Sequence, residues 1–132
     1  MPDYTAVRIN DIEAIYAGGM RRARAALGVR SFGMQVLELP PNEERYPEHD
    51  HSEQGQEEVY LALSGGGELE VEGERLPLDP ETIVRVGPSA RRKIRSGPEG
   101  LRILALGGVP GRAYEPAAIT ELGGPDPMAS AS

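Results

Sequence analysis

The central part of the chain consists of short segments in which apolar and polar residues alternate, and glycine or proline follows most of them. The clearest alternation lies in residues 68–72, where three glutamates are separated by Leu69 and Val71. A period of two is typical of a strand with one dry face, and glycine and proline mark turns. Turn signals that recur about every 8 to 12 residues indicate an antiparallel sandwich or barrel. The sequence therefore predicts an all-β fold.

Individual strands follow from the same pattern. The turn signal at residues 64–67 separates two of them, and Pro47 marks its segment as an edge strand or a bulge. The expected strands cover residues 30–39, 44–51, 57–63, 67–78 (a hairpin), 82–88, 91–96 and 101–107.

The chain is expected to have three parts. Residues 1–29 would form an N-terminal arm with a short helix, firmest from Met20 to Leu27 and ended by Gly28. Residues 30–107 would form the barrel, and residues 108–132 a coil tail whose end is disordered. A length of 132 residues suits one domain with one core.

Composition excludes several classes of function. There is no cysteine, which rules out disulfides, thiolate metal sites and a cysteine nucleophile. The net charge of −7 argues against binding to nucleic acid through a basic surface. No window approaches the roughly 18 apolar residues of a membrane span, and no secretion signal is seen, so no membrane association and a cytoplasmic location are predicted.

Charge is unevenly distributed along the chain. Acidic residues crowd positions 43–58, and basic residues crowd positions 85–95. Either the two clusters face each other across the barrel, or each is a solvated loop.

Both histidines of the chain, His49 and His51, lie one residue apart. On a strand, such residues point to one side about 6–7 Å apart, and Asp50 points to the other side. Glu58 and Tyr60 share one face of the next expected strand, so the Glu58 carboxylate would return beside the imidazoles. Two imidazoles and one carboxylate suit divalent Fe, Mn, Zn or Ni. The alternative is two exposed histidines in a polar loop.

The spacing of these residues resembles the first motif of the cupin superfamily. That motif runs His-x-His, a loop, Glu, six residues and Gly, here His49, His51, Glu58 and Gly65. The six-residue step to Gly65 selects Glu58 over Glu57 as the carboxylate. The gap of six residues between His51 and Glu58 is longer than usual, which leaves three weaker substitutes: Glu53, Gln56 and Glu57.

A second cupin-like motif covers residues 81–95. An apolar strand is followed by Gly87, Pro88 and Ser89 in place of the usual turn, and Arg92 falls where a fourth metal-binding histidine would be. The resemblance implies a jelly-roll cupin barrel with a cavity between its sheets, and often a homodimer. The superfamily includes dioxygenases, decarboxylases, isomerases, epimerases, storage proteins and ligand-sensing domains, so the fold selects no reaction.

Arginine is a permanent cation and a hydrogen-bond donor only, so Arg92 cannot ligate a metal. Three outcomes are open. Arg92 pairs with Glu58 and leaves a metal-free barrel, it lies beside a three-ligand metal and holds an anionic ligand, or it points outward while Arg91 points inward.

The favoured hypothesis is a single-domain cupin that binds a divalent metal through His49, His51 and Glu58. Arg92 and Tyr60 would contact a small anionic organic ligand. Whether the protein is an enzyme is left open, and its reaction would be of the isomerase, lyase or dioxygenase type. The alternative is a non-catalytic, metal-free small-molecule-binding or structural cupin in which Arg92 pairs with Glu58.

Overall fold

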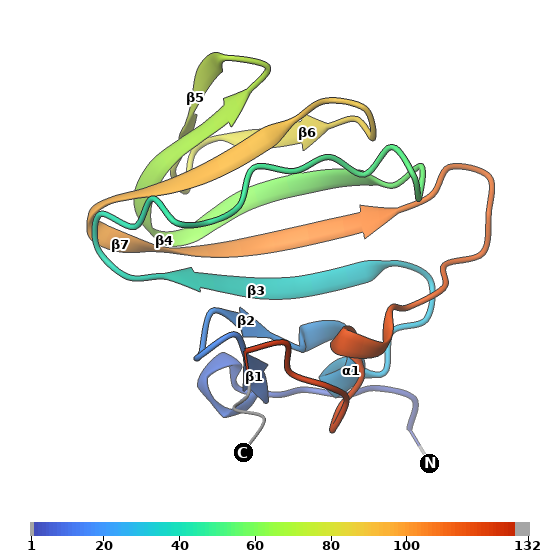
Figure 1. Ribbon diagram of the computed structural model, residues 1–132. Coiled ribbons are helices and arrows are strands. Elements are labelled where there is room, and N and C mark those ends of the chain that lie inside the picture. The colour runs from blue at the N-terminus through green and yellow to red at the C-terminus, as the bar shows by residue number, and fades with distance from the viewer. Residues whose placement is uncertain (1, 129–132) are drawn as a thin grey trace.

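Antiparallel β-strands dominate residues 2–128, the part of the chain that this computed structural model describes (Figure 1). Within these residues, helix is limited to α1 and two single-turn 3₁₀ helices, η1 and η2. In chain order the elements are η1 (Ile9–Asp11), β1 (Ala14–Ile15), β2 (Met20–Arg21), α1 (Ala23–Leu27), β3 (Gly33–Leu39), β4 (Glu57–Val71), β5 (Glu74–Leu78), β6 (Ile83–Val86), β7 (Arg92–Gly108) and η2 (Ala118–Thr120).

Two long strands, β4 and β7, pair along almost their whole length and bend halfway, so that each takes part in two sheets. The wide sheet contains β1, β2, β3, the second half of β7, the first half of β4, and β6. The narrow sheet contains the first half of β7, the second half of β4, and β5. The barrel interior lies between these two sheets, as the jelly-roll prediction requires.

Glycines allow the bend. Gly65 has a φ of 74°, and a Cβ there would lie 2.1 Å from the carbonyl oxygen of Gly100 on the paired strand. Only a residue without a side chain can take this conformation at this contact. The prediction of a turn at residues 64–67 is therefore wrong, because β4 continues through these residues and changes sheet without ending.

Substituting Gly65 with alanine is expected to destabilise the protein strongly. Gly73→Ala is the matched control, since Gly73 has a φ of 81° but nothing within 4 Å of the added Cβ. The control should cost about 1–2 kcal/mol for the left-handed backbone alone. Gly65→Ala should cost about 1–3 kcal/mol more, because the neighbouring backbone must move. Urea unfolding checks this difference, and equal costs would contradict it.

The main core fills the barrel and contains no tryptophan or phenylalanine. Its most deeply buried members include Tyr60, Leu69, Leu78, Ile94 and Ile103, each at most 1% exposed. A smaller apolar cluster lies on the outer face of the wide sheet, where Ile12 and Ala23 of the arm pack on Val36 of β3.

Three other predicted elements need correction. Residues 44–51 form no strand, and their one β-bridge to the sheet joins His49 to Arg92. The strands expected at 91–96 and 101–107 are one strand, β7.

The predicted helix is shorter, because residues 20–21 belong to β2 and α1 begins at Ala23. Gly28 does end it, in the left-handed conformation.

A buried guanidinium ties the tail to the arm. Arg22, 1% exposed, donates hydrogen bonds to the carbonyl oxygens of Ile119, Gly124 and Pro125 and contacts Glu13. The tail is thus held along the arm as far as residue 125, and the last four residues of the predicted disordered end lie outside the described residues. No helix between residues 2 and 128 is long and apolar enough to cross a membrane.

Candidate metal centre

The histidine segment is held against the start of β7 and the turn that precedes it. The His49 amide donates to the Arg92 carbonyl at 3.0 Å, and the Arg92 amide donates to the His49 carbonyl at 2.8 Å. The His51 amide donates to the Pro88 carbonyl at 2.9 Å. The sequence predicted a strand here, but the segment is irregular and lies beside the start of β7.

The two imidazoles nevertheless converge. Their ring centroids are 5.0 Å apart with an interplanar angle of 84°. The Nδ1 atom of His49 lies 3.0 Å from the carbonyl oxygen of Pro47, an acceptor only, so Nδ1 carries the proton and Nε2 keeps its lone pair. A hydrogen bond of this kind fixes both the tautomer and the ring orientation of a metal-binding histidine.

Glu58 comes to the same point from the inner face of β4. Its Oε1 atom accepts hydrogen bonds from Tyr60 Oη at 2.5 Å and Arg92 Nη1 at 2.7 Å, and it lies 3.0 Å from His51 Nε2. No hydrogen bond to its Oε2 atom is found within residues 2–128. Glu57 points to the outer face, where it pairs with Arg85 at 3.1 Å. The alternation along β4 thus selects Glu58, as predicted.

The surroundings of Glu58 favour its ionised form. Burial by itself would raise the pKa of the Glu58 carboxyl, but the hydrogen bonds from His51 and Tyr60, with the charges of His51 and Arg92, lower the pKa below its usual value. Burial and the Glu58 charge raise the pKa of the Tyr60 phenol, so Tyr60 stays neutral and donates its proton to the carboxylate.

Arg92 points inward and is fully buried, at 0% exposure. Its neighbour Arg91 points outward and pairs with Glu48 at 2.9 Å. The outcome with Arg92 outside and Arg91 inside is therefore wrong.

Most N–H groups of the Arg92 guanidinium already donate hydrogen bonds within the protein. Nη2 donates to the carbonyl oxygens of Gly87 and Ala90, Nε donates to Ala90, and Nη1 donates to Glu58. Of its five N–H groups, four are engaged, and one on Nη1 has no partner among the residues described. A bidentate interaction of Arg92 with a ligand carboxylate would break part of this network, whereas a single hydrogen bond from Nη1 would not.

The donor set fits a metal ion. One ligand atom from each of His49, His51 and Glu58 can be chosen so that the three lie within 4.8 Å of one another. The side chains of His51 and Glu58 are only 23% and 14% exposed, unlike those of an ordinary surface cluster. Two imidazole nitrogens and one carboxylate suit a first-row divalent ion that keeps open positions.

Other residues around the site lie as follows. Asp50 points away from the imidazoles and accepts from Ser52, as the alternation indicated. Tyr46 packs on the barrel core and tilts against the His49 ring, with centroids 5.8 Å apart. The Pro47, Gly87 and Ala90 carbonyls were not foreseen, since backbone oxygens carry no signal in a sequence.

The acidic and basic clusters of the sequence do face each other. Four contacts join them: Glu48 and Asp50 to Arg91, Glu57 to Arg85, and Glu58 to Arg92. The first three are exposed pairs of small energetic value, and the fourth is buried.

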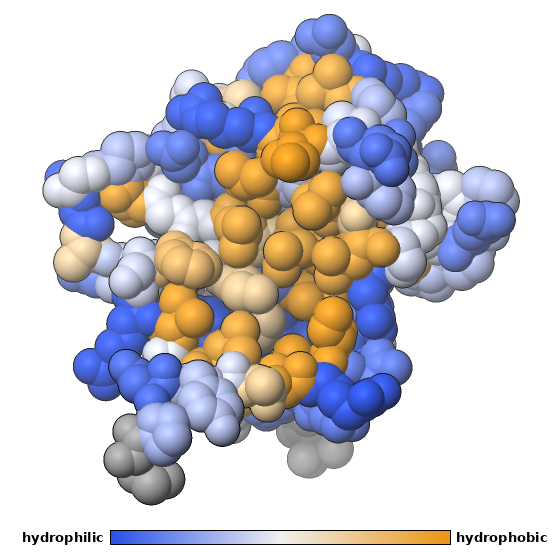
Figure 2. All heavy atoms as spheres, turned by 180° about the vertical axis from the view of Figure 1, so that it is seen from behind, coloured by the Kyte–Doolittle hydropathy of each residue, from blue (hydrophilic) through white to orange (hydrophobic). Residues whose placement is uncertain are grey.

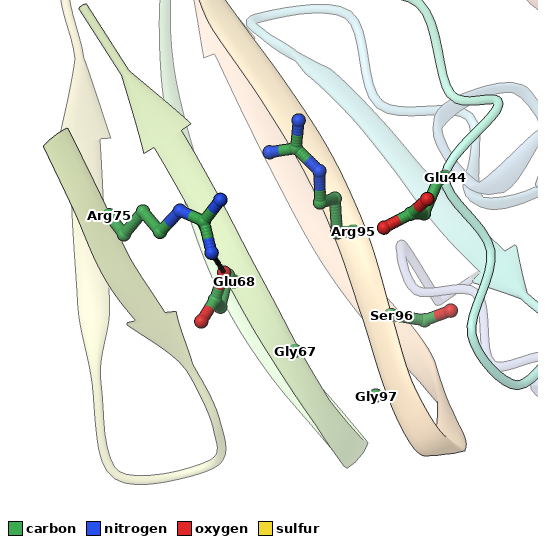
Figure 3. A pocket seen from close by; sticks show the side chains of 7 residues that line it. All are labelled: Glu44, Gly67, Glu68, Arg75, Arg95, Ser96 and Gly97. Carbon is green, nitrogen blue, oxygen red and sulfur yellow. Dashed lines mark hydrogen bonds and ion pairs between the residues drawn. The ribbon is translucent and has the colours of Figure 1, made fainter. Parts of the chain in front are cut away.

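A separate groove of about 380 Å³ lies over the narrow sheet (Figure 3). Arg75 and Arg95 flank it on different strands, and Glu44 reaches it from a loop. Arg75 pairs with Glu68 at 3.4 Å, and Arg95 pairs with Glu70 at 3.2 Å. These cross-strand ion pairs form a solvated charged face, apart from the metal-centre candidate.

Comparisons with known proteins give the fold. No protein-family model and no curated protein matches the chain. A cupin protein from Bacteroides fragilis superposes with a TM-score of 0.66 at 20% identity, covering 91% of this chain and 95% of that chain. A sugar phosphate isomerase from a cupin superfamily, from Silicibacter pomeroyi, gives 0.65 at 18% identity and covers 86% and 83%.

A third similar structure is the Cupin_2 domain of an XRE family transcriptional regulator from Enterobacter cloacae. It gives a TM-score of 0.52 at 24% identity and covers 63% of this chain and 86% of that chain. Identities this low show a shared fold alone, and these neighbours include both an enzyme and a regulator domain.

Proposed function

This chain has the cupin fold, and from that premise we propose that it binds one divalent metal ion and, on the metal, a small anionic organic ligand. His49, His51 and Glu58 would hold the ion. Fe, Mn, Zn and Ni are the candidate metals. The reaction, if there is one, stays unassigned.

One observation carries this proposal. Three potential ligand atoms converge, and the ring orientation of one of them, on His49, is already fixed by a hydrogen bond. Because the Nδ1 atom of His49 donates to the Pro47 carbonyl, the Nε2 atom of the same ring is left with a lone pair that can bind a metal. Exposed histidines in a polar loop would have neither feature.

The charge balance favours an anion. Glu58 contributes −1 and Arg92 contributes +1, while neutral imidazoles contribute nothing, so the protein leaves the charge of a divalent ion uncompensated. An anionic ligand supplies the missing charge, and the one remaining N–H of Arg92 Nη1 can donate to it. Tyr60 and Arg92 hold Oε1 of Glu58 in place during this binding.

Chemistry follows from the ion when it is bound. A divalent metal supplies a Lewis acid or an oxygen-binding centre, which is what isomerases, lyases and dioxygenases use. His49, His51 and Glu58 would hold the ion, and Arg92 would place a positive charge beside the Glu58 ligand.

The test is calorimetric titration of chelator-treated protein with Mn²⁺, Zn²⁺ and Ni²⁺ in turn. We expect one ion per chain. Oxalate, inorganic phosphate and glucose 6-phosphate are then titrated with and without metal, and at least one should bind only when metal is present. Failure of all three ions to bind would overturn the proposal.

A second candidate function is favoured by the Arg92–Glu58 pair itself. The two groups are 2.7 Å apart and Arg92 is completely buried, so the carboxylate already has a counter-ion without metal. A metal-free ligand-binding or structural cupin would keep this pair unchanged. In that case the titration shows no bound metal, and any ligand binds equally well in the presence of a chelator.

Two further expectations lie outside this test. The metal centre is built within one chain, so metal binding says nothing of the homodimer that the resemblance implies. The cytoplasmic location also stays a prediction.

A further inference from the structure

The inner face of the wide sheet carries two polar residues that the proposed metal centre does not use. On the outer face, Val59 lies opposite Leu106, and Figure 2 shows an apolar band down the centre of that face. The inner face lines the barrel core and is expected to be at least as apolar. It nevertheless holds Gln35 and Gln56, and glutamine is mostly an exposed residue in proteins. Two glutamines in this position need a physical reason.

Gln35 faces the barrel interior from β3. It alternates with Leu37 and lies opposite Ala105 of β7, and both of these residues belong to the barrel core. Its Oε1 atom is buried and accepts no hydrogen bond within residues 2–128. A buried acceptor without a partner costs stability, because it has lost its hydrogen bonds to water. A leucine would avoid this cost, so packing alone does not account for Gln35.

Gln56 brings a second amide to the same end of the barrel. It directly precedes β4 and, two residues before Glu58, points to the same side of that strand. Gly107 of β7 pairs with Glu58, and a Cβ on Gly107 would lie 2.5 Å from Nε2 of Gln56. The Gln56 amide therefore lies over Gly107, next to the position of Glu58 in the sheet. Among the residues described, it makes no hydrogen bond.

Small residues of β7 lie between Gln35 and the proposed metal centre. Ala105 lies opposite both Gln35 and Tyr60, and Gly107 lies opposite Glu58. No large side chain of β7 therefore separates Gln35 from the metal-binding residues. Neighbouring strands are about 4.8 Å apart, so β3 and β4 lie roughly 10 Å apart across β7. With side chains reaching in from both strands, this span suits a ligand of about four or five carbon atoms.

We propose that Gln35 and Gln56 bind a hydroxyl group of the ligand whose anionic end binds the metal, so that the ligand is a small hydroxylated acid. This inference rests on the proposed function and names the class of its ligand. A hydroxyl group both donates and accepts, which matches Oε1 of Gln35 as acceptor and Nε2 of Gln56 as donor. An apolar group would leave Oε1 of Gln35 unpaired, and a site built to bind a hydroxyl group discriminates against ligands that lack it.

The test compares acids that differ only in a terminal hydroxyl group. Calorimetry on the metal-loaded protein measures 4-hydroxybutyrate against butyrate and 5-hydroxyvalerate against valerate, in which the hydroxyl group lies at the far end from the carboxylate. At least one hydroxylated acid should bind about 10-fold more tightly than its plain counterpart. Gln35→Leu should reduce this preference below about threefold and raise the melting temperature by about 3–5 °C, because the unpaired acceptor is gone. Gln54→Leu is the control, since Gln54 is exposed, and it should leave the preference unchanged.

A pair of neighbouring glycines tests Gln56 without replacing it. Gly107→Ala places a methyl group where the Gln56 amide lies and should lower the preference for the hydroxylated acid at least about threefold. Gly108→Ala is the matched control on the same strand, because nothing lies within 4 Å of its added Cβ. It should leave the preference unchanged. Thermal melting confirms that both variants are folded.

Failure of this inference differs from failure of the metal centre. Metal titration without any acid tests the metal centre alone. If no ion binds, the same comparison of acids on the metal-free protein decides the inference. Equal binding of hydroxylated and plain acids, no binding of any of the four acids, or a preference that survives Gln35→Leu would overturn it, and each of these results leaves metal binding by His49, His51 and Glu58 untouched.

Discussion

Replacing His49 or His51 with alanine is expected to weaken binding of a divalent ion by more than about 100-fold. Loss of a residue that merely supports a ligand already costs 10- to 100-fold in affinity, and these residues are the proposed ligands themselves. The fold should survive, because both side chains are only half-buried and neither belongs to the barrel core. Calorimetry with Zn²⁺ or Ni²⁺ measures the affinity, and thermal melting measures the stability.

Asp50→Ala is the matched control for this result. Asp50 lies between the two histidines but faces the solvent side, where it accepts hydrogen bonds from Ser52. Its removal should change metal affinity less than about threefold, since an exposed charge is screened over the distance to the ion. If Asp50→Ala and His51→Ala weakened binding equally, the ion would be bound elsewhere in the acidic cluster.

Substituting Arg92 with methionine is expected to cost about 3–5 kcal/mol of stability. The change removes one partner of a buried ion pair and leaves the Glu58 carboxylate without a counter-ion. It also leaves the carbonyl oxygens of Gly87 and Ala90 without this donor. Urea unfolding at neutral pH measures the loss.

Two further variants identify the cause of the stability loss in Arg92→Met. Arg91→Met removes an exposed pair with Glu48 and should cost less than about 1 kcal/mol. Adding Glu58→Gln to Arg92→Met should recover part of the lost stability, because no buried charge then remains. An Arg92→Met protein as stable as Arg91→Met would show that the pair is not buried in solution.

Metal binding gives the Arg92 variant a second readout. A divalent ion within about 5 Å of the arginine is repelled by several kcal/mol at an effective dielectric constant of about 20. The Arg92→Met protein should therefore bind the ion more tightly than the wild type when no anionic ligand is present. It should also depend less on that ligand, since the single donor on Nη1 is gone.

Much of the candidate site could be predicted because it depends on side-chain alternation. The period of two along β4 places Glu58 and Tyr60 inside and Glu57 outside, and the structure confirms this. The convergence of His49 and His51 needs only that two residues one apart face the same way. That geometry holds in the irregular segment here as it would in a strand.

The rest depended on contacts that no local pattern encodes. Residues 44–51 were expected to form a strand, but they form one bridge to Arg92 and no ladder. The commitment of Arg92 to Gly87 and Ala90 requires the turn before β7 to close over its guanidinium. The arm was expected to contain one short helix, yet Tyr16 and Ala17 adopt positive φ and form the turn between the strands β1 and β2.

Arg92 contacts both segments that supply the proposed metal-binding side chains, the histidine segment and β4. Through its main chain it exchanges two hydrogen bonds with His49, and through its side chain it holds the carboxylate of Glu58. The main-chain bonds to His49 would form with any residue other than proline, whereas the side chain at this position sets the electric charge beside the ligating groups. Related chains that differ here would be expected to diverge in metal preference and in the ligands they accept, with the barrel itself left unaltered.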